Sequence, residues 1–302
     1  MTIALIAGTG GLPPHLAGSL KAAGNAPLVC EMEGFSSSIA GGFKRLSFRI
    51  ETLASFLNEL KRLDVTQICM AGAVSRPKVD PTLIDAATAP LVPRLSAAMA
   101  KGDDGTLREI VALFEEWGFE VVGAHEIAPE LLPNAGVLTQ IAPHDIETEV
   151  AVARKALDQM GRADIGQAVV VRDGTILVSE DDRGTAAMLN SLCQPSSQNV
   201  FMPNDTSTVL GIAISAVGIA AGAALADTAT KGPAEGGVLY KAPKPDQILT
   251  ADMPLIGPET AMQASEAGLA GIVIPSGVVM VLDLPQVVAI LNAQNMFLWV
   301  TS

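Results

Sequence analysis

Apolar runs of strand length alternate with amphipathic stretches of helical spacing along the first part of the chain. Strands are expected at 2–8, 26–32, 65–77 and 119–126, and helices at 13–23, 50–63, 82–100 and 104–117. Strand and helix in regular alternation predict a parallel sheet with helices on its faces. We therefore expect a Rossmann-like N-terminal α/β domain over residues 1–132.

The pattern changes after a proline-rich stretch without periodicity, residues 133–144, which we interpret as a linker between domains. Beyond it, helices are expected at 145–160, 184–192, 258–267 and 284–293, and strands at 270–275 and 296–300. Asp173-Gly174 predicts the turn of one hairpin, and Pro275 to Gly277 the turn of another. These elements predict a C-terminal mixed α/β domain over residues 145–302, with an atypical insert at about 193–235.

Composition and charge exclude several classes of protein. Hydrophobic residues make up 49% of the chain and charged residues 17%, which is ample for a large core and excludes overall disorder. Nineteen Lys and Arg against 32 Asp and Glu give a net charge of −13, and only eight Phe, two Trp and one Tyr occur. Without a basic footprint or an aromatic platform, nucleic acid is not expected as a partner.

The cysteines Cys30, Cys69 and Cys193 are an odd number without CxxC spacing. This indicates a reducing compartment and argues against a disulfide scaffold or a structural zinc site. The stretch Val209 to Ala226 carries no charge over 18 residues and approaches the length of a membrane span, about 20 residues. It is expected either to contact a membrane or to be a small-residue helix packed inside the protein or against a second copy.

The turn from Gly8 to Gly11 follows the first strand, where an α/β fold presents backbone N–H groups to phosphate. The full dinucleotide fingerprint fails, because Pro13 stands at its sixth position. A glycine turn without a ligand is equally expected. Ser75 and Arg76 stand at the end of another predicted strand, where a guanidinium can grip phosphate or carboxylate, or lie at the surface.

Two further groups combine cations with carboxylates. Lys101, Asp103 and Asp104 stand together at a helix start, where the two acids suit Mg²⁺ or only cap the helix. Lys241 and Lys244 lie three residues apart on a proline-stiffened loop, and Asp252 follows. Cations held near a carboxylate form a plausible pyrophosphate and metal site, and the alternative is a solvated loop.

Histidines do not suggest a metal centre. The three of them, His15, His125 and His144, lack ligand spacing for zinc. His125, beside Glu126 at a strand end, is the best placed for chemistry, although a structural role is expected more often at such a position.

Eight segments, in order along nearly the whole chain outside the insert, resemble the LpxI family of UDP-2,3-diacylglucosamine pyrophosphatases of lipid A biosynthesis. They are LIAGTGGLP (5–13), AGAVSRP (71–77), KGDDGTLREIV (101–111), GFEVVGAHE (118–126), ADIGQAVVVRDG (163–174), GGVLYKAPKP (236–245) with Gln247, DMPLIGPET (252–260) and GLAGIV (268–273). The resemblance implies Mg²⁺-dependent hydrolysis of the substrate to UMP and 2,3-diacylglucosamine 1-phosphate, in a cleft between the two domains.

The resemblance also implies roles for individual residues. For catalysis it implies Asp252 and Glu180; for Mg²⁺, Asp252, Asp103 and Asp104; for the substrate, Gly8, Thr9, Gly10, Gly11, Ser75, Arg76, Lys101, His125, Gln167, Thr185, Lys241 and Lys244. A substrate with acyl chains implies peripheral association with the cytoplasmic face of the membrane, and a homodimer is left open.

Two departures from the family pattern support an alternative function. Where the family usually shows EGTDAM, this chain has Arg183 and Ala186 in RGTAAM. The alternative is a catalytically weakened homologue that binds the UDP-lipid, or a related nucleotide, without efficient hydrolysis. A dinucleotide oxidoreductase is a third hypothesis, suggested by the glycine turn and by Glu31 after the second strand.

Overall fold

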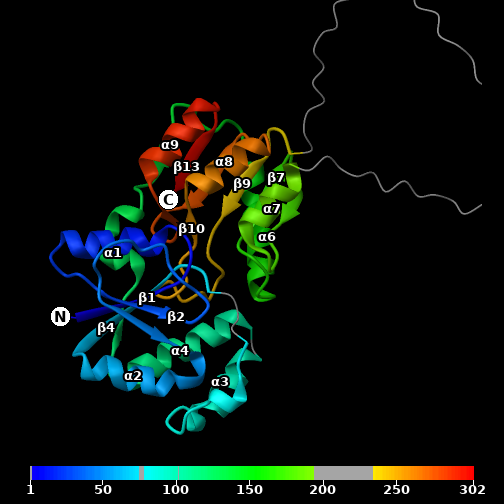
Figure 1. Cartoon of the computed structure of the whole chain (residues 1–302). Coiled ribbons are helices and arrows are strands. Elements are labelled where there is room, and N and C mark those ends of the chain that lie inside the picture. Colours follow the sequence, from blue (N-terminus) through cyan, green and yellow to red (C-terminus); the bar gives the residue numbers. More distant parts are fainter. Residues whose placement is uncertain (1, 75–77, 101, 194–233) are drawn as a thin grey trace, which may run out of the picture.

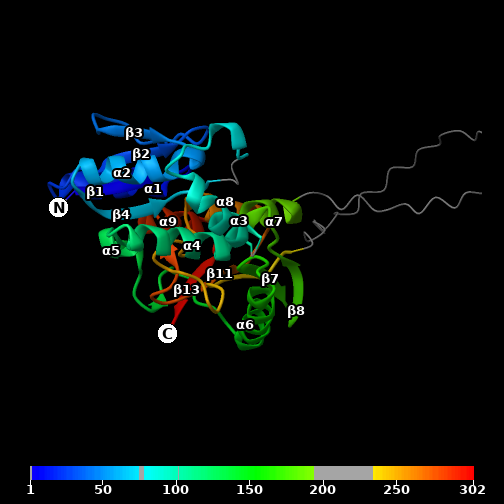
Figure 2. The ribbon, with the colours of Figure 1, turned by 90° about the horizontal axis from the view of Figure 1, so that it is seen from below.

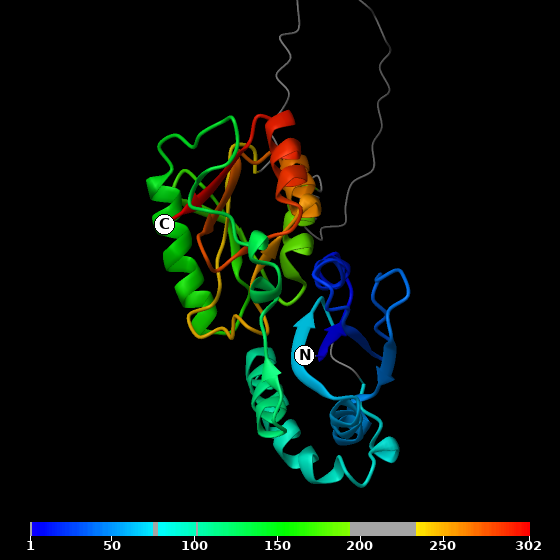
Figure 3. The same ribbon diagram turned by 90° about the vertical axis from the view of Figure 1, so that its left-hand side faces the viewer.

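A computed structural model of the chain describes residues 2–74, 78–100, 102–193 and 234–302. Two α/β domains lie against each other, the N-terminal one in the lower part of Figure 1 and the C-terminal one above it. Figure 3 shows the same two lobes from the side. The predicted fold class, a two-domain α/β protein with a parallel and a mixed sheet, is confirmed.

The N-terminal domain is built on a five-stranded parallel sheet in the order β3-β2-β1-β4-β5. Its strands are β1 (Thr2–Ala7), β2 (Leu28–Met32), β3 (Arg45–Phe48), β4 (Val65–Ala71) and β5 (Glu120–Val121). Its α-helices are α1 (Leu12–Ala22), α2 (Leu53–Arg62), α3 (Val92–Met99), α4 (Asp103–Glu116) and α5 (Ala124–Ile127). Leu57 and Phe114 pack α2 and α4 on one face of the sheet, and Leu16 and Ala124 pack α1 and α5 on the other (Figures 1 and 2).

Two parts of this domain differ from the prediction. Strand β3 was not expected, because RLSF is only four residues long and, at the edge of the sheet, buries only Phe48. The single helix expected over 82–100 is instead two 3-10 turns, Pro81–Leu83 and Ala89–Leu91, followed by α3. The prolines explain this, because a residue without an N–H is tolerated only in the first turn of a helix.

The C-terminal domain is built on a six-stranded mixed sheet in the order β6-β13-β11-β9-β7-β8. Its strands are β6 (Gly136–Val137), β7 (Ala168–Arg172), β8 (Thr175–Ser179), β9 (Val238–Lys241), β11 (Gly271–Pro275) and β13 (Phe297–Thr301). Helix α6 (Glu147–Arg162) packs on one face, and α7 (Gly184–Cys193), α8 (Pro258–Glu266) and α9 (Leu284–Ala293) on the other. The hairpin predicted at Asp173-Gly174 is confirmed, and both turn residues have positive φ.

The second predicted hairpin, through Pro275 to Gly277, is wrong. The chain leaves β11 and enters β12 (Met280–Val281), which pairs in parallel with β10 (Leu255–Ile256) in a separate two-stranded sheet. Strand β6 lies within the stretch expected to be a linker, and it pairs with β13. Part of residues 133–144 therefore belongs to the C-terminal sheet.

An apolar cluster joins the domains. Leu12 and Leu16 of α1 share this cluster with Met253 and Met280 of the C-terminal domain, and Leu282 packs against it. Apolar area removed from water is the main stabilising contribution at such a contact. The small β10-β12 sheet therefore packs against the start of α1.

No helix within the described ranges combines the length and apolarity that a membrane span requires. The apolar stretch from 209 to 226, with most of the predicted insert, lies outside the described residues.

Candidate active site

The C-terminal sheet brings three of the expected site residues to one edge. Strand β9 ends at Lys241, which pairs with Ala168 at the start of β7. The Glu180 N–H donates to the carbonyl of Ala168 at 2.9 Å, and the Ala242 N–H donates to the carbonyl of Gln167 at 3.1 Å. Gln167, Glu180 and Lys241 are therefore neighbours, although they come from three strand ends.

A chain of hydrogen bonds links Lys241 to Glu180 through Thr185. The Lys241 Nζ donates to Thr185 Oγ1 at 2.8 Å, and this hydroxyl donates to Glu180 Oε2 at 2.9 Å. Lys241 is 6% exposed and Glu180 7%, so both charges lie almost entirely out of water. Buried charges require partners of this kind, because desolvation otherwise costs several kcal/mol per ion.

Asp252 lies close enough to this chain to act on it electrostatically. Burial lowers the pKa of the Lys241 ammonium, and the negative charges of Glu180 and Asp252 oppose that shift. Unlike Glu180, Asp252 is exposed. The two carboxylates near Lys241 therefore differ in their access to water.

The loop between β9 and β10 fixes Asp252. Its backbone N–H donates to the carbonyl of Ile248 at 2.8 Å, and Gln247 Nε2 donates to Asp252 Oδ2 at 2.7 Å. Gln247 Oε1 accepts from the backbone N–H of Lys244 at 2.9 Å. Gln247 thus connects Asp252 to the segment 241–245, which carries both lysines and is called the lysine loop below. The sequence assigned Gln247 no role, and its place in the family segment was the only signal for it.

Lys244 forms an ion pair within its own domain. Its Nζ lies 2.5 Å from Asp164 Oδ1, so its charge is matched by an ion pair within the domain. Asp164 also meets the N-terminal domain: a Cβ on Gly102 would lie 2.5 Å from Asp164 Oδ2. The ion pair between Lys244 and Asp164 therefore lies where the two domains touch.

Asp103 and Asp104 form the first turn of α4, the position expected for both a cap and a metal site. Asp104 pairs with Arg108 at 2.8 Å, and Arg108 donates to the carbonyl of Asp246 at 2.7 Å. Within the described residues no group of three His, Cys, Asp or Glu side chains is arranged to hold a metal. The expected set of Asp103, Asp104 and Asp252 therefore does not form a three-ligand cage.

The glycine turn stands at the carboxyl ends of β1 and β4. Thr9 and Ala73 exchange two backbone hydrogen bonds, of 2.9 and 3.0 Å. A Cβ on Gly8 would lie 2.5 Å from the carbonyl oxygen of Ala73, and Gly10 has a φ of +100°. A Cβ on Gly11 would lie 2.8 Å from Cδ2 of Leu282, so the turn abuts the C-terminal domain on the side of Asp252's loop.

The remaining expected residues are distributed differently. Ser75, Arg76 and Lys101 lie outside the described residues. The Nδ1 atom of His125 is buried and has no hydrogen-bond partner among the described residues. Gln167 Oε1 is likewise buried without a hydrogen-bond partner in the described part of the chain, beside Lys241's strand.

The two positions that depart from the family pattern are both exposed. Arg183 donates to Asp181 through its Nε and Nη2, at 3.0 and 2.6 Å. These bonds lower the pKa of the Asp181 carboxyl to about 2. Ala186 follows Thr185 in the first turn of α7. The Arg183 charge is therefore matched by Asp181 beside the start of this helix.

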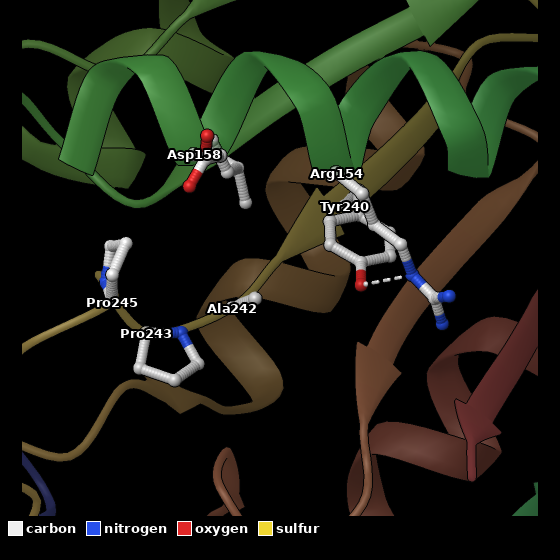
Figure 4. A pocket seen from close by; sticks show the side chains of 7 residues that line it. Arg154, Asp158, Tyr240, Ala242, Pro243 and Pro245 are labelled. Atoms are coloured by element: carbon white, nitrogen blue, oxygen red, sulfur yellow. Dashed lines mark hydrogen bonds between the residues drawn. The ribbon is translucent and has the colours of Figure 1, made fainter. Parts of the chain in front are cut away.

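A small cavity of about 170 Å³ lies behind the lysine loop, between that loop and α6. Figure 4 shows Pro243 and Pro245 on one side and Arg154 on the helix, with Arg154 Nε donating to the Tyr240 hydroxyl at 3.1 Å. Tyr240 packs toward α6, whereas Lys241, the next residue along β9, reaches Thr185 of α7. The cavity and the hydrogen-bonded series from Lys241 to Glu180 therefore lie on opposite faces of the sheet.

Similarity to known proteins agrees with the two-domain organisation. The LpxI N-terminal domain matches residues 2–131 and the LpxI C-terminal domain matches residues 134–299. The UDP-2,3-diacylglucosamine pyrophosphatase LpxI of Caulobacter vibrioides is 34% identical over 98% of this chain and 95% of its own length. An L-threonine dehydrogenase from Phytophthora infestans is similar over 40% of this chain and 34% of its own, with a TM-score of 0.25 and 10% identity, which supports no inference. The chain therefore belongs to the LpxI family.

Proposed function

We propose that this protein hydrolyses the pyrophosphate of UDP-2,3-diacylglucosamine, giving UMP and 2,3-diacylglucosamine 1-phosphate, as a step of lipid A biosynthesis. The observation that carries the proposal is the similarity, at 34% identity over 98% of the chain, to a relative named for that activity. The hydrogen-bonded series of Lys241, Thr185 and Glu180 in the C-terminal domain supports the proposal chemically.

Pyrophosphate hydrolysis requires a positioned water and neutralisation of phosphoryl charge. Asp252 is the exposed carboxylate beside Lys241, so it is the group that can reach water. We assign Asp252 to orienting the attacking water, and Lys241 to the phosphoryl oxygens. The cleft between the domains is the proposed location, because Gly11 contacts Leu282 next to the sheet that follows Asp252.

Mg²⁺ is proposed as the cofactor, shared between protein and substrate. This ion commonly takes one or two carboxylates together with waters and substrate phosphate oxygens. The exposed Asp252 fits that donor set, and Asp103 and Asp104 are the proposed acids from the N-terminal domain, although Asp104 also pairs with Arg108. When bound, the ion would supply neutralisation of the phosphoryl charge.

The N-terminal domain is proposed to bind the anionic part of the substrate. The backbone N–H groups of Gly10 and Gly11 stand before α1, an 11-residue helix whose positive end favours an anion, whereas the N–H groups of Gly8 and Thr9 donate to the carbonyls of Ala71 and Ala73 and so hold the turn in place. In the C-terminal domain, the buried Oε1 of Gln167 has no hydrogen-bond partner among described residues and is proposed to accept from a donor group of the substrate. Ser75, Arg76, Lys101, His125 and Lys244 remain proposed substrate contacts.

The substrate's two acyl chains support a further proposal, peripheral contact with the cytoplasmic face of a membrane through apolar surface. Because the net charge is −13, apolar contact is proposed to supply most of this binding. A homodimer is proposed as the alternative use of the apolar stretch from 209 to 226.

A second candidate function is a weakened homologue that binds the UDP-lipid without efficient hydrolysis. The exposed Arg183, paired with Asp181, and the small Ala186 favour it, because both stand where the family usually has acids. Purified protein incubated with the UDP-lipid and Mg²⁺ separates the two functions by the release of UMP, measured by anion-exchange chromatography. Binding of the UDP-lipid without UMP release would replace the first candidate by the second.

A further inference from the structure

The direction of the hydrogen bonds in the Lys241 chain is fixed by chemistry. An ammonium only donates, so the Thr185 hydroxyl accepts from Lys241 at 2.8 Å. That hydroxyl has a single hydrogen, and it points to Glu180 Oε2 at 2.9 Å. Glu180 therefore serves as an acceptor, the role that suits an ionised carboxylate.

Each group in this chain is held by a different element. Glu180 follows β8, Thr185 is the second residue of α7, and Lys241 ends β9. The backbone at Glu180 is confined as well, because a Cβ on Gly166 would collide with the Glu180 carbonyl oxygen. The ammonium is therefore fixed in space by two strands and a helix.

The two carboxylates near Lys241 suit different tasks. Glu180 is 7% exposed and one of its oxygens is occupied by Thr185. Asp252 is exposed and its Oδ2 is held by Gln247. A group that activates water must reach water, which favours Asp252, whereas a buried carboxylate beside a buried ammonium suits a counter-ion.

We infer that Thr185 and Glu180 are positioning residues that hold the Lys241 ammonium for the pyrophosphate, and that Glu180 takes no part in bond breaking. This rests on the proposed function, and it changes the role expected for Glu180 from catalytic to structural support of a cation. An ammonium has three N–H groups, of which Thr185 accepts one. Two donors are left for phosphoryl oxygens.

The inference predicts a distinctive kinetic effect. Lys241 grips the phosphoryl oxygens in ground and transition states alike, so loosening it weakens binding without slowing the bound complex. Thr185→Val, which removes the hydroxyl at nearly constant shape, and Glu180→Gln, which removes the charge, are each expected to raise KM by about tenfold and to change kcat by less than about threefold. Thr185→Ser, which keeps the hydroxyl, is expected to restore KM.

Titration calorimetry with inorganic pyrophosphate provides a readout that does not depend on turnover. The dissociation constant is expected to rise in Thr185→Val and Glu180→Gln by about the same factor as KM. Thr175→Val is the matched control, because Thr175 is exposed at the start of β8, away from the chain of hydrogen bonds. If Thr185→Val does not fold, Glu180→Gln carries the test.

Three results would overturn the inference: a fall in kcat of about 100-fold at unchanged KM in Glu180→Gln, wild-type constants in Thr185→Val, or failure of Thr185→Ser to restore KM. The first would make Glu180 a catalytic residue. A wild-type protein that releases no UMP, but whose pyrophosphate binding weakens in Thr185→Val, would refute the proposed function and leave the positioning role supported.

Discussion

At the carboxyl ends of β1 and β4 the N-terminal sheet presents backbone, whereas at the ends of β8 and β9 the C-terminal sheet presents charged side chains. Around Gly8 the chain approaches Ala73 too closely for a side chain. Around Lys241, in contrast, side chains fill the site, and the buried charges of Lys241 and Glu180 are connected through Thr185. Backbone N–H groups suit an anion of fixed position, while fixed charges beside an exposed carboxylate suit bond breaking. The comparison supports the proposal that the N-terminal edge only binds, whereas the C-terminal edge binds through Lys241 and carries the chemistry through Asp252.

The largest expected effect tests the chemical edge. Asp252→Ala is expected to lower kcat by at least about 100-fold, while binding of the UDP-lipid survives, because a group that orients water acts mainly in the transition state. Single-turnover UMP release and calorimetric binding measure the two quantities separately. Asp246→Ala, an exposed carboxylate on the same loop, is the matched control and should keep wild-type kinetics. Near-normal turnover in Asp252→Ala would remove this residue from the mechanism.

The next largest effect is a difference in KM between variants of the two lysines at the C-terminal edge. Lys241→Ala is expected to raise KM by about tenfold or more, because its ammonium has donors left for the substrate. Lys244→Ala is expected to raise KM less, since Asp164 already matches the Lys244 charge. Steady-state kinetics on both variants provide the measurement. Equal effects would mean that the ion pair with Asp164 opens when substrate binds.

The departures from the family pattern give a gain-of-function test at the same edge. Arg183→Glu combined with Ala186→Asp is expected to raise the hydrolysis rate by about tenfold, because it returns acids to the start of α7 beside Thr185. Arg183→Glu alone is the control, since it removes the pair with Asp181 without adding an acid at residue 186. Rapid hydrolysis by the natural protein, slowed by the double change, would exclude both positions from a metal site.

Much of this arrangement could be predicted from the sequence because its signals are local. Strand and helix alternation, the Asp173-Gly174 turn and the strand ending near Lys241 each depend on neighbouring residues. The pairing of Lys244 with Asp164 could not, because the partners are 80 residues apart and meet only after the C-terminal domain folds.

Local sequence patterns also could not predict that the two carboxylates differ in their exposure to water. Glu180 and Asp252 are both acids near strand ends, and only the packing of β7, β8 and α7 buries the first. Asp104 does not cap α4, whose N-cap is Gly102 without a side-chain hydrogen bond, and its bond to Arg108, four residues on, is a pair that local spacing could predict.

The smallest expected effect tests the backbone edge through a pair of glycines. Gly8→Ala is expected to lower the free energy of unfolding by about 1–3 kcal/mol, because the new Cβ would meet the Ala73 carbonyl at 2.5 Å and separate β1 from β4. It should also weaken UMP binding while leaving single-turnover rates at saturation within about threefold of wild type. Urea unfolding and calorimetry measure these quantities.

Gly18→Ala is the control, because Gly18 is exposed on α1 and a Cβ there meets no atom of the described residues within 4 Å. Alanine in a helix interior is expected to stabilise this variant by about 0.5–1 kcal/mol without affecting binding. If Gly8→Ala binds UMP as wild type does, the glycine turn is packing alone and its assignment to binding fails. If Gly8→Ala slows the saturated single turnover instead, the backbone edge takes part in the chemistry, and the division between the two edges is wrong.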